Sequence, residues 1–376
     1  MKIPSFMALI FLLFLICNIG HALSLYRDSS GNDTRLSFTS ILFRHGQRNP
    51  NAFYPKDPYI DMSYWPDGLK MLTKKGKLQE YELGQWLRRR YESLIPDGKY
   101  SEELVYVQST DVDRTLMSAQ ANLAGLFYPR KEEMWSDLPW QPIPVHTVPK
   151  KLDKLLSMGF PCPRLIEEDH AVKKSDFLKK YNEEHKKLYK YLTKYTGEKI
   201  KDPKSCDLIY TNLLIESQTI NNFTIPDWAK KVYPDTLHKI GGFSFALPTS
   251  TTILKRLRGG PLLKEIITHM KQKRNGILFP NRNLWIYSGH DDTVAALLNT
   301  MGVFEQHMPP FTATVMVDLR KNKNNKFFVE IYYKNSTEEP FLLTIPGCTP
   351  TCPLDDFEAH LSEVIPENWD AECQVN

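Results

Sequence analysis

Few features of this sequence point to a specialised class of protein. It has only 6 cysteines in 376 residues, which excludes a miniprotein held together mainly by disulfides. It contains no internal repeat or low-complexity tract, and its 41% hydrophobic and 24% charged residues are typical of a globular chain. The net charge of +4 is too small to indicate binding to nucleic acid or to an anionic membrane.

The N-terminus contains the one long apolar run. Lys2 precedes a dense apolar stretch over residues 6–16, and Gly20-His21-Ala22 follows it. A positive start, a short apolar stretch and a small-x-small end predict a secretory signal peptide over residues 1–22. A transmembrane anchor is the alternative, but the run is short for one. Because no later stretch could span a bilayer, we expect residues 23–376 to be secreted and soluble, with no stable membrane anchor.

If the chain is exported, glycosylation and disulfide formation become possible, and the sequence contains a pattern for each. Three triplets fit the glycosylation acceptor pattern, and they begin at Asn32, Asn222 and Asn335. Cys17 lies within the predicted signal, which leaves five cysteines, an odd number that predicts two disulfides and one spare thiol. Cys348 and Cys352 flank a proline-containing turn and could form a local disulfide. A metal site is the alternative, but no Cys/His pair has zinc-ligand spacing.

Strands that run directly into helices predict an α/β fold. Strands are expected over residues 36–43, 104–108 and 284–287, and helices follow the second and third. This alternation indicates a mostly parallel sheet with flanking helices. Residues 312–319 and 327–333 predict a hairpin at the edge of the sheet.

The middle of the chain has a different pattern. Helices with proline-punctuated connections dominate residues 150–260, and the clearest helix covers 175–195, with Gly197 placed to stop it. Its many lysines indicate a solvated face. We therefore expect an α/β core over about 30–150 and 260–376, with a smaller helical cap inserted over about 150–260.

The ends of the expected strands concentrate residues suited to phosphate chemistry. In open α/β sheets, ligands bind beyond the carboxyl ends of the strands. The residues expected there are Arg44, His45, Arg48, Arg114, His290 and Asp291. The forked set of donors on arginine fits the oxygens of a phosphate group. A neutral histidine can attack phosphorus, and a carboxylic acid can protonate the departing alcohol.

Each of these residues also has an ordinary structural interpretation. Arg114 could pair with a neighbouring aspartate, and Asp291 could cap a helix. His45, His290 and Asp291 could form a metal site instead, but the arginines would repel the cation. The other histidines show no ligand spacing and are interpreted as structural; among them are His146, His170, His185, His238 and His269.

The motif Arg44-His45-Gly46-x-Arg48-x-Pro50 resembles the signature of the histidine acid phosphatases. Five fixed positions make this far more specific than a two-residue motif. Further similarity lies in Gly289-His290-Asp291 and in residues 109–119, 140–147 and 347–353. The branch that it resembles contains the animal prostatic and lysosomal acid phosphatases and the insect venom acid phosphatases.

The resemblance implies a role for each site residue. His45 would be the nucleophile that forms a phosphohistidine, and Asp291 would protonate the leaving alcohol. The residues implied to bind the phosphoryl oxygens are Arg44, Arg48, Arg114 and His290. No metal or organic cofactor would be needed, and an acidic optimum would follow if Asp291 must be protonated. Phosphate monoesters or phosphoproteins would be the substrates, and the chain would pair into a homodimer.

The cysteines match the family only in part. The resemblance implies disulfides between Cys162 and Cys373 and between Cys348 and Cys352. Another family pair falls at Ser217 and Thr314, so both of its cysteines are absent. Cys206 would therefore remain unpaired.

Two departures flank the phosphate loop. Gln47 stands where several relatives carry an acidic residue, and Asn49 where relatives usually carry Ser or Thr. We expect these two differences to affect the catalytic rate and its pH dependence more than the class of reaction.

The resulting hypothesis is a secreted acid phosphatase, with the lysosomal lumen as the alternative location. A narrower phosphatase acting on inositol phosphates or nucleotides, or a mutase, is a second enzyme hypothesis. The non-enzyme alternative is a catalytically weak or inactive secreted glycoprotein, of venom or allergen type, that retains the fold. Because His45 and Asp291 are both present, the sequence favours an active enzyme.

Overall fold

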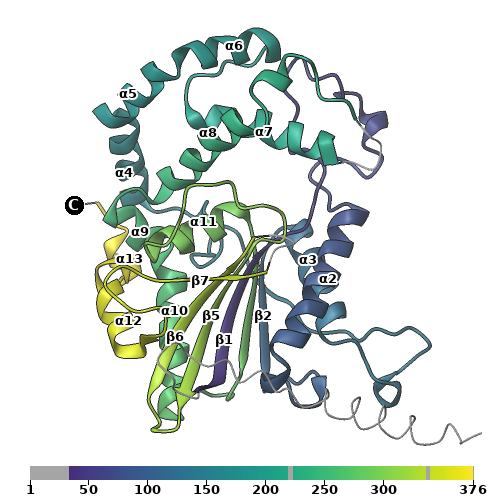
Figure 1. Ribbon diagram of the computed structural model, residues 1–376, viewed down its shortest axis with the longest axis vertical. Coiled ribbons are helices and arrows are strands. Elements are labelled where there is room, and N and C mark those ends of the chain that lie inside the picture. The colour runs from purple at the N-terminus through teal and green to yellow at the C-terminus, as the bar shows by residue number, and fades with distance from the viewer. Residues whose placement is uncertain (1–33, 219–222, 336–338, 376) are drawn as a thin grey trace, which may run out of the picture.

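A computed structural model describes residues 34–218, 223–335 and 339–375 (Figure 1). The predicted signal peptide and the acceptor residues Asn32 and Asn222 lie outside these ranges. Asn335 lies inside them and is half-buried. No helix in the described ranges has the length and apolar character needed to cross a membrane.

An eight-stranded mixed sheet forms the centre of the fold, with strand order β3-β2-β4-β1-β5-β6-β7 and β8 beside β6. Strands β1 to β4 run parallel to one another, and β5 to β8 pair in antiparallel fashion. The strands are β1 (Thr34–Arg44), β2 (Val105–Thr110), β3 (His146–Val148), β4 (Leu284–Gly289), β5 (Thr314–Asn322), β6 (Phe327–Lys334), β7 (Phe341–Leu343) and β8 (Cys352–Pro353).

Helices cover both faces of the sheet, which explains why β1 is fully buried from Phe38 to Arg44. On β1, Phe38 and Leu42 pack in one core with residues of α10, α11 and α12, while Ile41 and Phe43 pack in another with residues of α2 and α3. The sheet helices are α2 (Lys74–Arg90), α3 (Asp113–Leu126), α10 (Gly260–Asn275), α11 (Asp291–Thr300) and α12 (Leu354–Leu361). The short helix α13 (Trp369–Glu372) lies away from the sheet, where Trp369 packs in a separate cluster.

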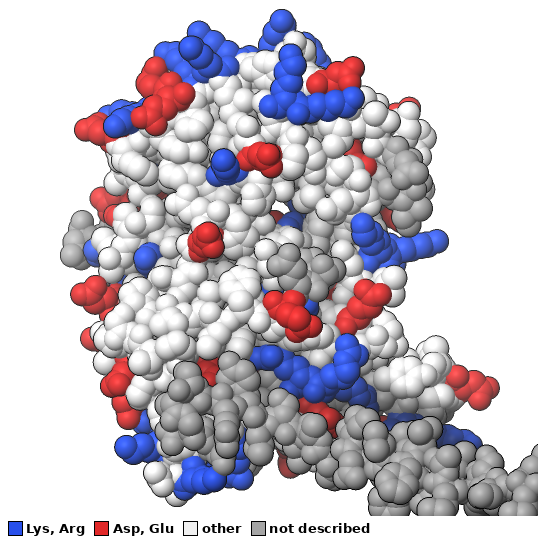
Figure 2. Space-filling view, viewed as in Figure 1, with Lys and Arg blue, Asp and Glu red and all other residues white. Residues whose placement is uncertain are grey.

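A group of helices arches over one end of the sheet (Figure 1). These helices are α4 (Pro163–Lys174), α5 (Asp176–Glu184), α6 (Lys186–Thr196), α7 (Pro203–Gln218), α8 (Asp235–Ala246) and α9 (Thr252–Arg258). A further buried cluster lies among them and includes Leu192, Leu213 and Leu237. Basic and acidic side chains are interspersed along the upper edge over α5 and α6, as expected for a solvated face (Figure 2).

Two expectations about the elements need correction. The single helix expected over 175–195 is two helices, α5 and α6, because the backbone leaves helical geometry at His185 (φ −96°, ψ 4°). There the Tyr181 carbonyl oxygen accepts from both the backbone N–H and the Nδ1 atom of His185, at 3.2 and 2.8 Å. Gly197 ends α6 in the left-handed region, as predicted. The hairpin of β5 and β6 is not at the sheet edge, because β5 pairs with β1 and β6 is flanked by β7 and β8.

Candidate active site

The predicted phosphate loop leaves the carboxyl end of β1 and passes close to the backbone of α2 at Gly46. Arg44 is the last residue of β1, and Arg44, His45 and Arg48 are each less than 5% exposed. A Cβ atom on Gly46 would lie 2.3 Å from the Gly76 carbonyl oxygen near the start of α2. Any side chain there would therefore push the loop away from α2, which explains the need for glycine.

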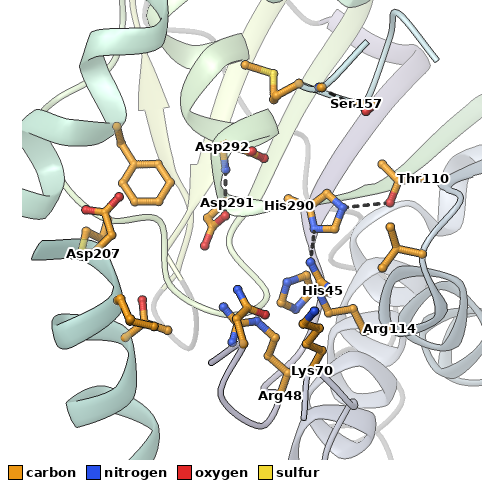
Figure 3. Close-up of a pocket in the computed structure, with 18 of the residues that line it drawn as sticks. His45, Arg48, Lys70, Thr110, Arg114, Ser157, Asp207, His290, Asp291 and Asp292 are labelled. Carbon is orange, nitrogen blue, oxygen red and sulfur yellow. Dashed lines mark hydrogen bonds between the residues drawn. The ribbon is translucent and has the colours of Figure 1, made fainter. Parts of the chain in front are cut away.

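Three separate elements bring the remaining predicted residues to the same place. Arg114 is in the first turn of α3, and His290 and Asp291 connect β4 to α11. A cavity of about 860 Å³ is lined by His45, Arg48, Arg114, His290 and Asp291 (Figure 3). Arg44 joins this group through an ion pair, with its Nη2 atom 2.8 Å from Asp291 Oδ2. The structure thus brings together all six residues that the strand ends predicted.

The environment of His45 favours a neutral, nucleophilic imidazole. Its Nδ1 atom lies 2.8 Å from the Gly46 carbonyl oxygen, which can only accept, so we assign the proton to Nδ1. Nε2 then carries the lone pair. Burial, with added repulsion from Arg44 and Arg114, holds the pKa of His45 well below its ordinary value. The ring therefore stays unprotonated in mild acid.

His290 is also neutral, and both of its nitrogens are engaged. Arg114 Nη2 lies 3.3 Å from Nδ1, and Thr110 Oγ1 lies 3.0 Å from Nε2. Because arginine can only donate, Nδ1 accepts and Nε2 donates to Thr110. Burial, together with Arg114, lowers the pKa of His290 to about 3. In this arrangement, His290 orients Arg114.

Three guanidinium groups give the site its positive charge: Arg44 and Arg48 are buried, and Arg114 is half-buried. The Nη1 atom of Arg44 donates to the Pro309 carbonyl oxygen at 2.5 Å, and its Cζ atom lies 4.1 Å from the centre of the Phe311 ring. These contacts hold Arg44 but leave its Nε atom without a partner among the described residues. The same is true of the Nε atoms of Arg48 and Arg114. Unpaired buried donors are costly unless a ligand satisfies them, and oxygen-rich anions suit guanidinium groups.

Two adjacent carboxyl groups at the start of α11 have opposite pKa shifts. Burial alone would raise the pKa of Asp291, but the charges of Arg44 and Arg48 outweigh it and hold the pKa below its ordinary value. Burial and the charge of Asp291 raise the pKa of Asp292 to about 6. The free enzyme thus holds Asp291 as the anion that pairs with Arg44.

Sequence reasoning missed several residues of the cavity. Thr110, Asp292 and Lys70 line it, as do Lys204 and Asp207 of α7. Asp292 could have been noticed, since it directly follows the predicted proton donor. The others carry no local motif, because their place in the cavity depends on how distant segments pack. Asn49, a departure from the family pattern, donates from Nδ2 to the Gly68 carbonyl oxygen at 2.7 Å and so ties the phosphate loop to the segment that carries Lys70.

The remaining predicted residues fall outside the cavity. The structure pairs Cys162 with Cys373 and Cys348 with Cys352, and Cys206 is free and buried. His146 stacks on Tyr106. Across the described ranges, no group of three or more His, Cys, Asp or Glu side chains has the geometry to hold a metal ion.

Proteins with similar sequences are acid phosphatases by name. Residues 35–334 match the histidine phosphatase superfamily (branch 2). The chain is 41% identical over 361 residues to prostatic acid phosphatase from Bos taurus, with 93% of this chain and 90% of the relative covered. It is 37% identical over 346 residues to lysosomal acid phosphatase from Rattus norvegicus, with 90% of this chain and 80% of the relative covered.

Solved structures with a similar fold include the apo form of Hafnia alvei phytase. It has a TM-score of 0.68 and 18% identity, and the match covers 91% of this chain and 99% of that chain. At this identity the likeness supports the fold alone, and it confirms the predicted α/β class. The acid phosphatase relatives, which match nearly the whole chain, identify it as a phosphatase. The chain therefore belongs to branch 2 of the histidine phosphatase superfamily.

Proposed function

We propose that this protein is a secreted acid phosphatase that hydrolyses phosphate monoesters through a phosphohistidine, without a metal ion. The observation that carries the proposal is the orientation of His45. Its Nδ1 proton is held by the Gly46 carbonyl oxygen, so Nε2 is the nitrogen left for a substrate in a cavity that Arg48 and Arg114 line and that Arg44 adjoins through its ion pair with Asp291. A neutral nucleophile beside three arginines is well suited to attack an anionic phosphoryl group.

The chemistry has two balanced steps. In the first, the Nε2 lone pair of His45 forms a bond to phosphorus as the bond to the ester oxygen breaks, and Asp291 gives its proton to the departing alcohol. In the second, water attacks phosphorus, the P–N bond breaks, and Asp291 takes the proton released by water. Inorganic phosphate then leaves.

The arginines would bind the phosphoryl oxygens throughout both steps. The unpaired Nε atoms of Arg44, Arg48 and Arg114 support this role, because each can donate to an anion. His290 would hold Arg114 in place for the phosphate. For His290 itself to bind a phosphoryl oxygen, its ring must carry a proton on the nitrogen that faces the phosphate. A bound phosphate would compete with Asp291 for Arg44, which raises the pKa of Asp291 and lets it carry the proton for the leaving group.

Several finer features remain part of this proposal. The signal-like N-terminus supports secretion, while the names of the relatives leave the lysosomal lumen as the alternative. Asn335 is a candidate glycosylation site, together with Asn32 and Asn222. Phosphoproteins as substrates, a homodimer, and a helical cap inserted over about 150–260 also remain predictions. An inactive venom-type glycoprotein is the competing proposal, and the complete set of His45, Asp291 and arginines disfavours it.

The test is hydrolysis of p-nitrophenyl phosphate at pH 5 by the wild type and by His45→Ala, each with and without EDTA. We expect EDTA to have no effect and His45→Ala to lower kcat by roughly a thousandfold or more, because the covalent step is lost. His170→Ala, which removes an exposed histidine on α4, is the matched control and should keep wild-type activity. Activity that survives in His45→Ala, or that disappears with EDTA, would contradict the mechanism.

A further inference from the structure

The cavity has more positive charge than one phosphoryl group requires. Six cationic side chains lie in its wall or directly beneath it, against four carboxyl groups. The cationic residues are Arg44, Arg48, Lys70, Arg114, Lys150 and Lys204. The carboxyl residues are Asp111, Asp207, Asp291 and Asp292.

Ion pairs account for only part of this charge. Asp291 pairs with Arg44, and Asp207 pairs with Lys204 at 2.8 Å. Burial raises the pKa values of Asp207 and Asp292 to about 6, so both lose negative charge in mild acid. A phosphate monoester brings at most two negative charges. With all four carboxyl groups ionised, one dianionic phosphate would cancel the excess positive charge. In mild acid, where Asp207 and Asp292 are protonated, the cavity remains positive when one phosphoryl group is bound, which favours a substrate that carries a second anionic group.

Lys70 is placed to bind that second group. Lys70 lines the cavity together with His45, Arg48 and Arg114, and its side chain is labelled among them in Figure 3. Within the described ranges, its ammonium group has no ion pair or hydrogen bond of its own. Its charge is therefore available to a ligand in the cavity.

The backbone of Lys70 is held in an unfavourable conformation. Its φ of 66° lies in the left-handed region, which lysine rarely adopts and which glycine adopts freely. Hydrogen bonds to the phosphate loop enforce this geometry: Lys70 N donates to the Pro50 carbonyl oxygen, and Asn49 N donates to the Met71 carbonyl oxygen, each at 2.9 Å. Strained residues that point into active sites are candidates for a functional role.

We propose that Lys70 binds a second anionic group on the substrate, so that the enzyme prefers phosphate monoesters carrying another phosphate or a carboxylate near the reacting ester. This inference rests on the proposed phosphatase activity. Lys70 does not contact the reacting atoms in this scheme. It is a specificity residue, and its removal should change the choice of substrate more than the basal rate.

Three matched aryl esters test the proposal: phenyl phosphate, 3-carboxyphenyl phosphate and 1,3-phenylene bisphosphate. For the wild type at pH 5 and low ionic strength, we expect kcat/KM to be about three- to tenfold higher for an ester with a second anion, counted per phosphate group. Lys70→Gln removes the charge and should abolish this preference, while phenyl phosphate hydrolysis stays within about twofold. Lys70→Arg should restore it, and 0.5 M NaCl should weaken it.

A glycine variant separates strain from specificity. Lys70→Gly should abolish the preference and also raise the urea midpoint of unfolding, because glycine tolerates the positive φ. Asn325→Gly is the matched control, since Asn325 has a φ of 61° in the exposed turn between β5 and β6. It should leave the substrate preference unchanged.

The outcomes distinguish this inference from the proposed function. If the wild type does not hydrolyse phenyl phosphate, the phosphatase proposal fails. If it does so and shows no preference for esters with a second anion, or if Lys70→Gln keeps the preference, only the Lys70 proposal fails. A preference for the bisphosphate alone identifies the second group as phosphate, and an equal preference for the carboxyl ester shows that either anion is accepted.

Discussion

At the scale of single residues, the site depends on pKa values that burial and neighbouring arginines set. The pKa of His45 is depressed by burial and by Arg44, so its imidazole should stay neutral, and activity should persist, well below the ordinary histidine value of 6.5. Asp291 is an anion in the free enzyme because Arg44 pairs with it. Asp291 can therefore act as an acid only when a bound phosphate replaces it as the partner of Arg44.

The proton donor can be tested by varying the leaving group. Asp291→Asn should lower kcat by roughly 10²- to 10⁴-fold for glycerol 2-phosphate, whose alcohol needs a proton, and much less for p-nitrophenyl phosphate, whose phenolate leaves readily. Steady-state kinetics with both esters measures this difference. Asp292→Asn is the matched control, because this neighbouring carboxyl group does not pair with Arg44, and it should keep the wild-type dependence on the leaving group. Equal losses for both esters in Asp291→Asn would contradict the assignment.

At the scale of elements, a pair of buried carboxyl groups joins α7 to the segment that follows the phosphate loop. Glu216 is 1% exposed and Asp57 is 4% exposed, and the two are hydrogen-bonded neighbours. Asn212 Nδ2 also donates to Asp57 Oδ2 at 3.1 Å. Burial and the charge of Asp57 raise the pKa of Glu216 to about 8. The pair therefore packs best when it holds a proton.

This pair predicts how stability depends on pH. Between the ordinary value of 4.5 and about 8, the folded protein keeps a proton on Glu216 that the unfolded chain has lost. The contribution of Glu216 to stability should therefore be greatest below pH 4.5 and fall as the pH rises toward 8, by at most about 1.4 kcal/mol per pH unit. Glu216→Gln should flatten this slope in urea unfolding between pH 5 and 8. Glu167→Gln, at an exposed site on α4, is the control and should retain the slope. An unchanged slope in Glu216→Gln would show that the proton on Glu216 is not its cause.

At the scale of the whole molecule, a long-range disulfide joins the helical region to the end of the described chain. Cys162, at the start of α4, pairs with Cys373 across a sequence separation of 211. A buried cluster surrounds it and includes Leu254 and Leu257 of α9. The ion pair between Arg256 and Glu372 adds a second link between these regions.

The entropy of loop closure predicts that the two disulfides contribute different amounts to the free energy of unfolding. Removing the Cys162–Cys373 bridge with paired alanine substitutions should cost about 5 kcal/mol of unfolding free energy, because it releases a long loop in the unfolded chain. Removing Cys348–Cys352, with a sequence separation of 4, should cost only about 2 kcal/mol. Urea unfolding at pH 5 measures both values. Equal losses would show that loop closure does not govern their contributions.

The sequence by itself determined which residues can carry out the chemistry and where the main strands lie. The motif around His45, the Gly289-His290-Asp291 element and the strands near β1, β2 and β4 are local patterns, and parallel strands must end at one edge of the sheet. Local patterns also specified the stop of α6 at Gly197. They failed at His185, where the backbone leaves helical geometry in a stretch that periodicity alone would continue as one helix.

Only the tertiary structure decided how these groups act. The tautomer of His45, the opposite pKa shifts of Asp291 and Asp292, and the place of Lys70 in the cavity all depend on neighbours far away in the chain. The interior position of β5 likewise depends on its pairing with β1. Burial and electrostatics are sums over spatial neighbours, so motif and periodicity can name the catalytic residues but cannot set their protonation or their selectivity.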